Sequence, residues 1–291
     1  MNWPERMSLA IDYIEDNLKG DVSIEDVAKI ACCSKFHFHR VFFSYFNITI
    51  AEYLRRRKFT LAAVEIVNSR SKIMDIALKY GYDSPNAFTR AFRNFHGLNP
   101  SEARVSQLEL SSYSRATLPI ETREVETMNY KIVEKPSFKI IGRSKRFEFN
   151  DFAKNGKKFW KEYVGSDEYK TLCQISNGKP GSITEAPLLT AYFPKEKSKL
   201  DEFVDVLGIE SIADTDSSQF EVHTVPPARY AEFNCSYKSS MKTNRYIYGE
   251  WFSATGYERD DNKPDIVAYL PMPYRHFSEM AVRWWIPVVK G

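Results

Sequence analysis

The stretch from residue 23 to residue 104 carries one helix-turn-helix pattern twice, and this duplication is the strongest constraint on the fold. The second copy begins with an apolar helical face made of Ile73, Ile76, Ala77 and Tyr80, followed by the turn glycine Gly81. Ser84 is then a helix N-cap with Pro85 after it, and a second apolar face is made of Phe88, Ala91, Phe92 and Phe95. Glycine accepts the backbone conformation that a sharp turn needs. The pattern predicts a short helix, a tight turn and a second helix that ends at Gly97.

The first copy repeats these residues about one unit earlier. Ile24, Asp26, Val27 and Ala28 match the second copy at an offset of 49 residues, and Ser34, Phe38, Arg40 and Phe42 match it at an offset of 50. The segment 49–68 between the copies predicts one long helix, whose twenty residues span roughly 30 Å. Successive major-groove faces lie about 34–36 Å apart on one side of a DNA duplex. One such chain can therefore present two recognition helices to adjacent grooves.

The outer faces of these two recognition helices carry the candidate DNA-reading residues: Lys35, Phe36, His39 and Arg40 in the first copy, and Asn86, Thr89 and Arg90 in the second. Arginine binds guanine in bidentate fashion and asparagine binds adenine. Arg40→Ala is therefore expected to relax specificity at one base pair and to cost about 1–3 kcal/mol. Two alternatives stay open. Phe36 contacts either a thymine methyl group or its own domain, and Arg90 either reads DNA or braces Glu52 or Glu102.

Residues 5–110 resemble the DNA-binding domain of AraC/XylS-type transcription regulators. The resemblance rests on an ordered run in the second copy: Ala77, Gly81-Tyr82, Asp83-Ser84, Phe88, Arg90, Phe92, Arg93, Gly97 and Pro100. It implies an all-α, homeodomain-like domain with two helix-turn-helix motifs that binds double-stranded DNA. The sequence departs from the family at Cys32-Cys33, where a glycine is usual in the first turn.

Charge and composition agree with this interpretation. Residues 23–104 hold 13 Lys and Arg against 7 Asp and Glu, a net charge of +6, whereas the whole chain carries +3. A basic surface suits a DNA phosphate backbone. At 291 residues, 43% hydrophobic and with no apolar run near 18 residues, the chain is expected to form two soluble, cytoplasmic domains outside any membrane. Four cysteines without paired spacing predict no disulfide framework, and His37 and His39 at i, i+2 predict no metal site and no cofactor.

The expected organisation is a DNA-binding domain at 1–110, a linker at 111–127 and a second domain at 128–291. The second domain is also doubled, because 130–136 resembles 220–226 and 191–194 resembles 268–271. Each half is expected to fold as strand, strand, helix, strand, strand, giving an α+β domain. The halves would pair about a pseudo-twofold axis, with a groove between their helices and the shared sheet.

Residues 128–291 resemble the GyrI-like effector-binding domain through FEVHTVPPARYAEF at 220–233, YGEWF at 248–252 and the closing WWIPV. This resemblance implies a site for a small hydrophobic effector. The candidate lining combines aromatic rings with charged groups: Trp160, Tyr192, Tyr230, Glu232, Glu250, Trp251, Tyr269, Arg283 and Trp284. A glutamate often precedes the tyrosine-proline turn in such regulators, but Val267 and Ala268 stand there. Glu232 or Glu250 favours a cation, whereas Arg283 favours an anionic or neutral ligand.

The leading hypothesis is a non-enzymatic, ligand-responsive transcription regulator with activator character. A first alternative makes the second domain a hydrolase with Glu232 or Glu250 as its acid or base, although no nucleophile and base motif accompanies them. A second alternative makes it a protein-binding module for RNA polymerase or another partner.

Overall fold

The computed structural model describes residues 3–105, 110–118, 128–177, 179–195, 202–211, 218–271 and 276–290. The chain forms two compact units. We call residues 1–38 with 45–120 the N-terminal unit, and residues 39–44 with 121–291 the C-terminal unit. The short segment 39–44 therefore belongs with the C-terminal unit, although it lies in the chain between two parts of the other.

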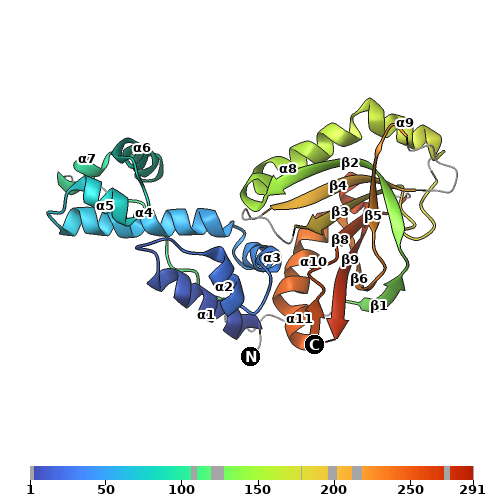
Figure 1. The fold of residues 1–291 in the computed structure, drawn as a ribbon, viewed down its shortest axis with the longest axis horizontal. Coiled ribbons are helices and arrows are strands. Elements are labelled where there is room, and N and C mark those ends of the chain that lie inside the picture. The colour runs from blue at the N-terminus through green and yellow to red at the C-terminus, as the bar shows by residue number, and fades with distance from the viewer. Residues whose placement is uncertain are drawn as a thin grey trace. The chain divides into compact units, whose positions relative to one another are not determined.

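The helices of the predicted doubled pattern are present (Figure 1): α1 (Trp3–Asp16), α2 (Ile24–Ile30), α3 (Lys35–Phe46), α4 (Ile50–Asn68), α5 (Ile73–Lys79), α6 (Pro85–His96) and α7 (Pro100–Val105). The second copy follows its sequence signals closely. The Ser84 hydroxyl accepts a hydrogen bond from the Ala87 backbone N–H at 3.4 Å, and Pro85 occupies the first turn of α6. Gly97 ends α6 with a left-handed φ of +84°.

Both turns adopt the left-handed conformation. Gly81 has a φ of +85°, and Cys32, at the matching position of the first copy, has a φ of +53°. The cysteine therefore does not loosen the first turn, but it carries a Cβ atom where the backbone favours glycine. The departure from the family pattern leaves the motif intact at a conformational cost.

The long helix α4 joins the two copies and packs the core of the second. Its 19 residues span about 28 Å at 1.5 Å each, as predicted from the sequence. The Thr49 hydroxyl caps its start by accepting from the Glu52 N–H at 3.3 Å. Phe59 then packs among apolar residues from α4 to α7: Ala62, Ala63, Ile66, Ile76, Ala77, Tyr80, Phe88, Phe92 and Ala103.

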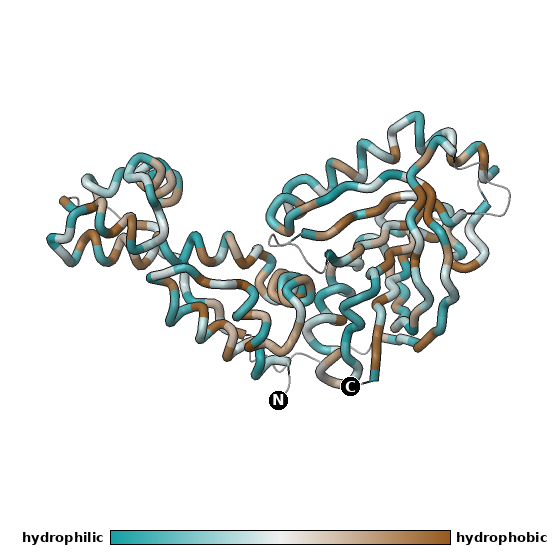
Figure 2. Tube along the Cα trace, in the orientation of Figure 1, coloured by the Kyte–Doolittle hydropathy of each residue, from teal (hydrophilic) through white to brown (hydrophobic). Residues whose placement is uncertain are grey.

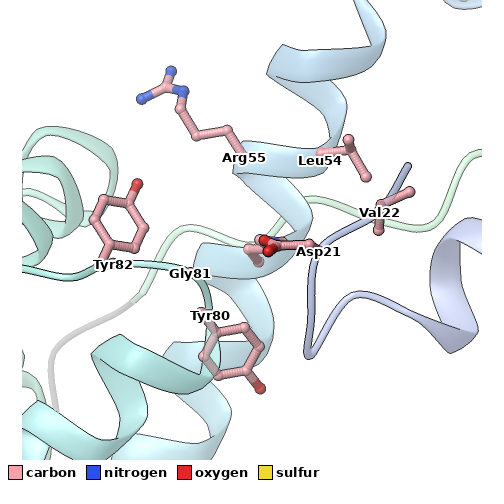
Figure 3. Close-up of a pocket in the computed structure, with 8 residues that line it drawn as sticks. Asp21, Val22, Leu54, Arg55, Tyr80, Gly81 and Tyr82 are labelled. Atoms are coloured by element: carbon pink, nitrogen blue, oxygen red, sulfur yellow. The ribbon is translucent and has the colours of Figure 1, made fainter. Parts of the chain in front are cut away.

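A hollow of about 440 Å³ marks the junction of the two copies on α4 (Figure 3). Asp21 precedes α2, Gly81 lies in the second turn, and both line the hollow with Lys58. The Lys58 ammonium donates to the Gly20 carbonyl at 2.8 Å. A Cβ on Gly81 would lie 3.4 Å from the same Nζ atom. Lys58 therefore ties the loop before α2 to α4 and lies beside the second turn.

Part of the segment that was expected to be a linker runs along α4. The backbone N–H of Tyr113 donates to the Thr60 hydroxyl at 2.9 Å, and the N–H of Ala116 donates to the Tyr53 hydroxyl at 3.0 Å. Residues 119–127 of the expected linker lie outside the described residues.

The C-terminal unit confirms the duplicated α+β architecture. Its first half contains β1 (Tyr130–Lys135), β2 (Phe138–Glu148), α8 (Phe149–Val164), α9 (Asp167–Ile175), β3 (Leu188–Pro194) and β4 (Glu202–Glu210). Its second half contains β5 (Glu221–Val225), β6 (Ala228–Ser236), α10 (Ser240–Tyr246), a π-helical turn (Ile247–Trp251), α11 (Phe252–Thr255), β7 (Tyr257–Arg259), β8 (Asp265–Tyr269) and β9 (Ala281–Lys290).

The strand order is β1-β6-β9-β8-β3-β4-β2-β5, with β7 paired to β9. The order reads the same from both ends when the two halves are exchanged, so β3 and β8 meet at the pseudo-twofold axis. All paired strands are antiparallel. One face of the sheet packs an apolar core that includes Ile140, Leu189 and Trp285. In Figure 2 β4 is coloured mainly hydrophobic, whereas α8 is largely hydrophilic.

Candidate effector and DNA sites

Three polar side chains stand in register across the centre of the sheet. Tyr192 on β3 pairs with Asp265 on β8 and with Asp205 on β4. Directly paired residues of neighbouring strands project to the same face. Tyr192 therefore lies between two carboxylates, on the face that α8 and the π-helical turn cover through Phe152 and Tyr248.

Asp265 is fully buried and is held by two groups of its own half. Arg259 donates to Oδ1 from Nε at 3.0 Å and from Nη2 at 2.8 Å, and the Tyr248 hydroxyl donates to Oδ2. Burial opposes ionisation, but the Arg259 and Arg40 guanidinium groups hold the pKa of Asp265 below its usual value. The site therefore keeps a buried negative charge with a defined orientation.

A third group, and the second cation, reaches Asp265 from the segment 39–44 of the same unit. Arg40 Nε lies 3.2 Å from Asp265 Oδ2, and the Arg40 side chain is only 12% exposed. Its guanidinium carbon lies 5.3 Å from the ring centre of Tyr192, 5.0 Å from that of Tyr248 and 5.7 Å from that of Trp284. Each such cation–π contact is worth about 0.5–2 kcal/mol. We call Asp265, Tyr192, Tyr248 and Trp284 the cation cage.

Asp205 lies beside the cation cage, paired in register with Tyr192. It is 3% exposed, and the Thr190 hydroxyl donates to its Oδ1 at 2.6 Å. Burial raises the pKa of Asp205 to about 7, and this hydrogen bond offsets only part of the effect. Tyr269 is close enough for its own pKa to be raised by burial and by Asp205, and its ring contacts Trp160 at 6.0 Å. A positive charge that binds beside Asp205 would therefore favour the ionised form of this second carboxylate.

The structure brings together four of the residues predicted to line the effector site: Trp160, Tyr192, Tyr269 and Trp284. Glu232 is also buried, but it accepts from Trp285 Nε1 at 3.0 Å on the opposite face. Arg283 lies 3.4 Å from Glu232 and 2.9 Å from Glu185 there. Successive strand residues project to opposite faces, so Arg283 points away from the face of Trp284.

The remaining predicted lining residues lie elsewhere. Tyr230 packs against Trp285 in the apolar core, with their ring centres 5.8 Å apart. Trp251 packs against Phe233 and stacks on Tyr257 at 5.6 Å, and Glu250 is exposed. Neither Glu232 nor Glu250 therefore stands beside the cation cage, where the hydrolase alternative would need its acid or base.

Four charged or polar residues of the site were missed from the sequence: Asp205, Tyr248, Arg259 and Asp265. Two of them left a signal. Asp205 interrupts the apolar strand run FVDVLGI, and Asp265 begins the apolar run DIVAY, where a charged residue is costly unless it has a partner. Val267 and Ala268 stand where such regulators often have a glutamate, and this strand carries its carboxylate at Asp265.

The predicted DNA-reading residues of the second copy face outward. Asn86 and Arg90 are exposed and Thr89 is half-buried on α6. The carboxylates suggested as alternatives for Arg90 have other partners. Glu52 pairs with Arg55 at 2.8 Å and with Arg56 at 2.7 Å, and Glu102 accepts from the Asn99 N–H at 2.7 Å.

The predicted residues of the first copy are more enclosed. Phe36 and His39 are buried, and Lys35 is half-buried. The His39 ring stacks on Phe149 at 4.5 Å within the C-terminal unit, next to the contacts of Arg40. The two copies therefore differ: the α6 face is open, whereas the central part of the α3 face is occupied.

Metal-binding and membrane-spanning features can be considered for the described residues. Across the described ranges given above, no group of three His, Cys, Asp or Glu side chains is placed to hold a metal ion. Within the same ranges no helix combines the length and the apolar character needed to cross a membrane.

Comparisons with known proteins assign both parts of the chain. Residues 27–106 match the family described as "Helix-turn-helix domain", and residues 131–288, more than half of the chain, match that described as "Integron-associated effector binding protein". The uncharacterized HTH-type regulator YbfP of Bacillus subtilis is 33% identical over 112 residues, which are 38% of each chain. This chain therefore spans well under half of that relative.

Other relatives are covered more fully. The HTH-type transcriptional activator AarP of Providencia stuartii is 37% identical over 94 residues, which are 32% of this chain and 70% of AarP. Among solved structures, SAV2435 bound to tetraphenylphosphonium is similar over 56% of this chain and 94% of its own, with 13% identity and a TM-score of 0.46.

Proposed function

Because this chain belongs to the AraC-type helix-turn-helix transcription regulators and carries an effector-binding domain of the integron-associated, GyrI-like family, we propose that this domain binds a small effector. The proposed effector is a lipophilic organic cation bound in the cation cage. The protein is thus a DNA-binding transcription regulator. Its cytoplasmic location and a contact with RNA polymerase stay predictions.

One observation carries the proposal: a delocalised organic cation already occupies the cage, in the form of the Arg40 guanidinium. The cage offers this cation one buried carboxylate and three aromatic faces. Aromatic faces attract a diffuse positive charge, and a buried carboxylate rejects an anion of the same shape. Arg283 lies on the opposite face of the sheet, so it does not favour an anionic ligand at this site.

We infer that the doubled helix-turn-helix part of the chain reads DNA through α3 and α6, with α4 setting their spacing. Asn86, Thr89 and Arg90 are available for base or phosphate contacts on the open face of α6. Lys35, Phe36, His39 and Arg40 are the corresponding residues of α3. The doubled motif suits a site of two adjacent major grooves on one side of the duplex.

The test uses two ions of nearly equal size and opposite charge. Tetraphenylphosphonium and tetraphenylborate are titrated into the full chain in a calorimeter, and we expect only the phosphonium ion to bind. Asp265→Asn and Trp284→Leu are expected to weaken this binding at least tenfold. Arg283→Ala, which alters the opposite face, is the matched control and should leave it unchanged.

Equal binding of both ions would show that the cage does not select charge. Unchanged phosphonium binding in a folded Trp284→Leu protein would place the site elsewhere. Trp284→Leu keeps every charge in place, so it answers the question even if loss of the Asp265 charge prevents folding.

A further inference from the structure

We propose that Arg40 is an internal competitor for the effector, so that one side chain couples effector binding to DNA reading. This inference rests on the proposed function of the cation cage. A cationic effector takes the place of Arg40 at Asp265 and thereby frees α3 for DNA, so the effector strengthens DNA binding.

The two uses of Arg40 exclude each other. To read a guanine, its guanidinium must point two donors at the base edge in the major groove. In the structure, its Nε lies 3.2 Å from Asp265, and three aromatic rings surround the group within 6 Å. A side chain that is 12% exposed and enclosed in this way cannot meet a base pair. The chain therefore has a closed state, with Arg40 in the cage, and an open state, with Arg40 released.

A second contact holds the same turn of α3. The His39 ring lies almost parallel to Phe149, at an angle of 5° and a distance of 4.5 Å between ring centres. His39 is also one of the residues predicted to read DNA. The closed state thus occupies two neighbouring members of the recognition face, and release of the turn would free both.

The cage keeps its charge and shape when Arg40 leaves. Arg259 still donates twice to Asp265 Oδ1, and Tyr248 still donates to Oδ2. These partners belong to the C-terminal part of the chain itself and keep the carboxylate oriented. When Arg40 leaves, the cage loses the positive charge above Tyr192, Tyr248 and Trp284, and another cation can replace that charge.

Linkage then fixes the direction of regulation. An effector that binds only the open state shifts the population toward it, and DNA that binds only the open state does the same. Each ligand must therefore strengthen the binding of the other by the same factor. The apparent dissociation constant of either ligand equals the intrinsic constant divided by the open fraction.

The first experiment removes the competitor. Tetraphenylphosphonium is titrated into the full-length wild type, Arg40→Ala and Arg90→Ala, the last being an exposed arginine of the second recognition helix. If about nine in ten molecules are closed, Arg40→Ala should bind the ion about tenfold more tightly than the wild type. Arg90→Ala should bind it as the wild type does. Unchanged or weaker binding by a folded Arg40→Ala protein would overturn the proposal.

The second experiment needs no effector. The full chain is labelled with 5-fluorotryptophan, and the resonance of Trp284 is assigned with Trp284→Phe. A duplex selected from a random library by the full-length protein is then added. We expect the Trp284 resonance to move toward its position in Arg40→Ala, because Arg40 leaves the ring in both cases.

The two experiments separate the two proposals. If neither protein binds the phosphonium ion but DNA moves the Trp284 resonance, the proposed effector class is wrong and the internal competitor stands. If the ion binds but both the Arg40→Ala affinity and the Trp284 resonance stay at their wild-type values, the competitor is refuted and the cage remains an effector site.

Discussion

Asp205→Asn tests the electrostatics of the site through protein stability alone. Asp205 is buried, and burial raises its pKa to about 7. Asparagine has nearly the same shape and can still accept the hydrogen bond that Thr190 donates at 2.6 Å. The substitution therefore removes the ionisation and little else.

The direction in which pH changes the stability follows from the pKa of Asp205 in the folded and unfolded chain. In the unfolded chain Asp205 ionises near its ordinary pKa of 3.8, whereas in the folded protein it ionises near 7. Below about pH 4 both states hold the proton, and the stability is then at its highest for this group. Between about pH 4 and 7 only the unfolded state loses the proton, so the free energy of unfolding falls by about 1.4 kcal/mol per pH unit. A shift of about three units gives a loss of about 4 kcal/mol, which stays constant above pH 7.

Urea denaturation followed by tryptophan fluorescence measures the difference. Four of the five tryptophans lie in the C-terminal unit: Trp160, Trp251, Trp284 and Trp285. We expect the asparagine variant to equal the wild type within about 1 kcal/mol at pH 4.5, and to exceed it by about 2–4 kcal/mol at pH 8.

Glu210→Gln is the matched control for Asp205→Asn. Glu210 is equally buried, but its carboxylate accepts hydrogen bonds from the Ile183 N–H at 2.9 Å and from the Thr184 N–H and hydroxyl at 2.7 Å each. A neutral amide satisfies these donors less well, so this variant should lose about 1–3 kcal/mol. A stability difference between wild type and Asp205→Asn that does not change with pH would refute the reasoning about Asp205.

Three further predictions concern the effector site and the DNA-binding part. Tetraphenylphosphonium should bind more tightly at pH 8 than at pH 6, because ionised Asp205 adds a negative charge beside the cage; equal affinities by calorimetry would contradict this. Gly81→Ala should cost about 1–2 kcal/mol because its φ is +85°, whereas Cys32→Gly should gain up to about 1 kcal/mol because Cys32 has a φ of +53°. Thermal unfolding of the two variants should show opposite signs. Arg57→Ala should cost about 1–3 kcal/mol, because Arg57 donates to the half-buried Glu15 from Nη2 at 2.5 Å, and an unchanged denaturation midpoint would exclude that role.

Much of the fold could be predicted because its signals are local. The spacing of apolar residues, the cap at Ser84 and the glycine at Gly97 define α6 within one or two residues. The repeated strand motifs defined the two halves of the second domain, and their symmetric strand order follows from the duplication. These features depend on residues that are close together in the sequence, so the sequence of one chain is enough to predict them.

The candidate effector site was harder to predict because its members come from distant parts of the chain. Tyr192, Tyr269, Trp160 and Trp284 were predicted because aromatic residues suit a lipophilic ligand wherever they lie, and their role as its lining stays a prediction. The sheet register, which places Tyr192 between Asp205 and Asp265, depends on two strand pairings that the sequence does not specify. Glu232 was expected in the site, but on β6 it projects to the face of the sheet opposite the cation cage.

The position of Arg40 shows why motif and role can diverge. The motif predicted a helix here, which is present as α3, and it also predicted that Arg40 on the outer face of this helix reads guanine. Nothing near Arg40 in the sequence suggests another partner. Its partner Asp265 lies more than 200 residues later, and a guanidinium has the same requirements in both places: a planar acceptor and desolvated surroundings. The chemistry that lets an arginine read guanine also lets it fill the cage that we propose for an organic cation. A regulator can therefore link its two ligands through one residue, provided that the closed state is only a few kcal/mol more stable than the open one.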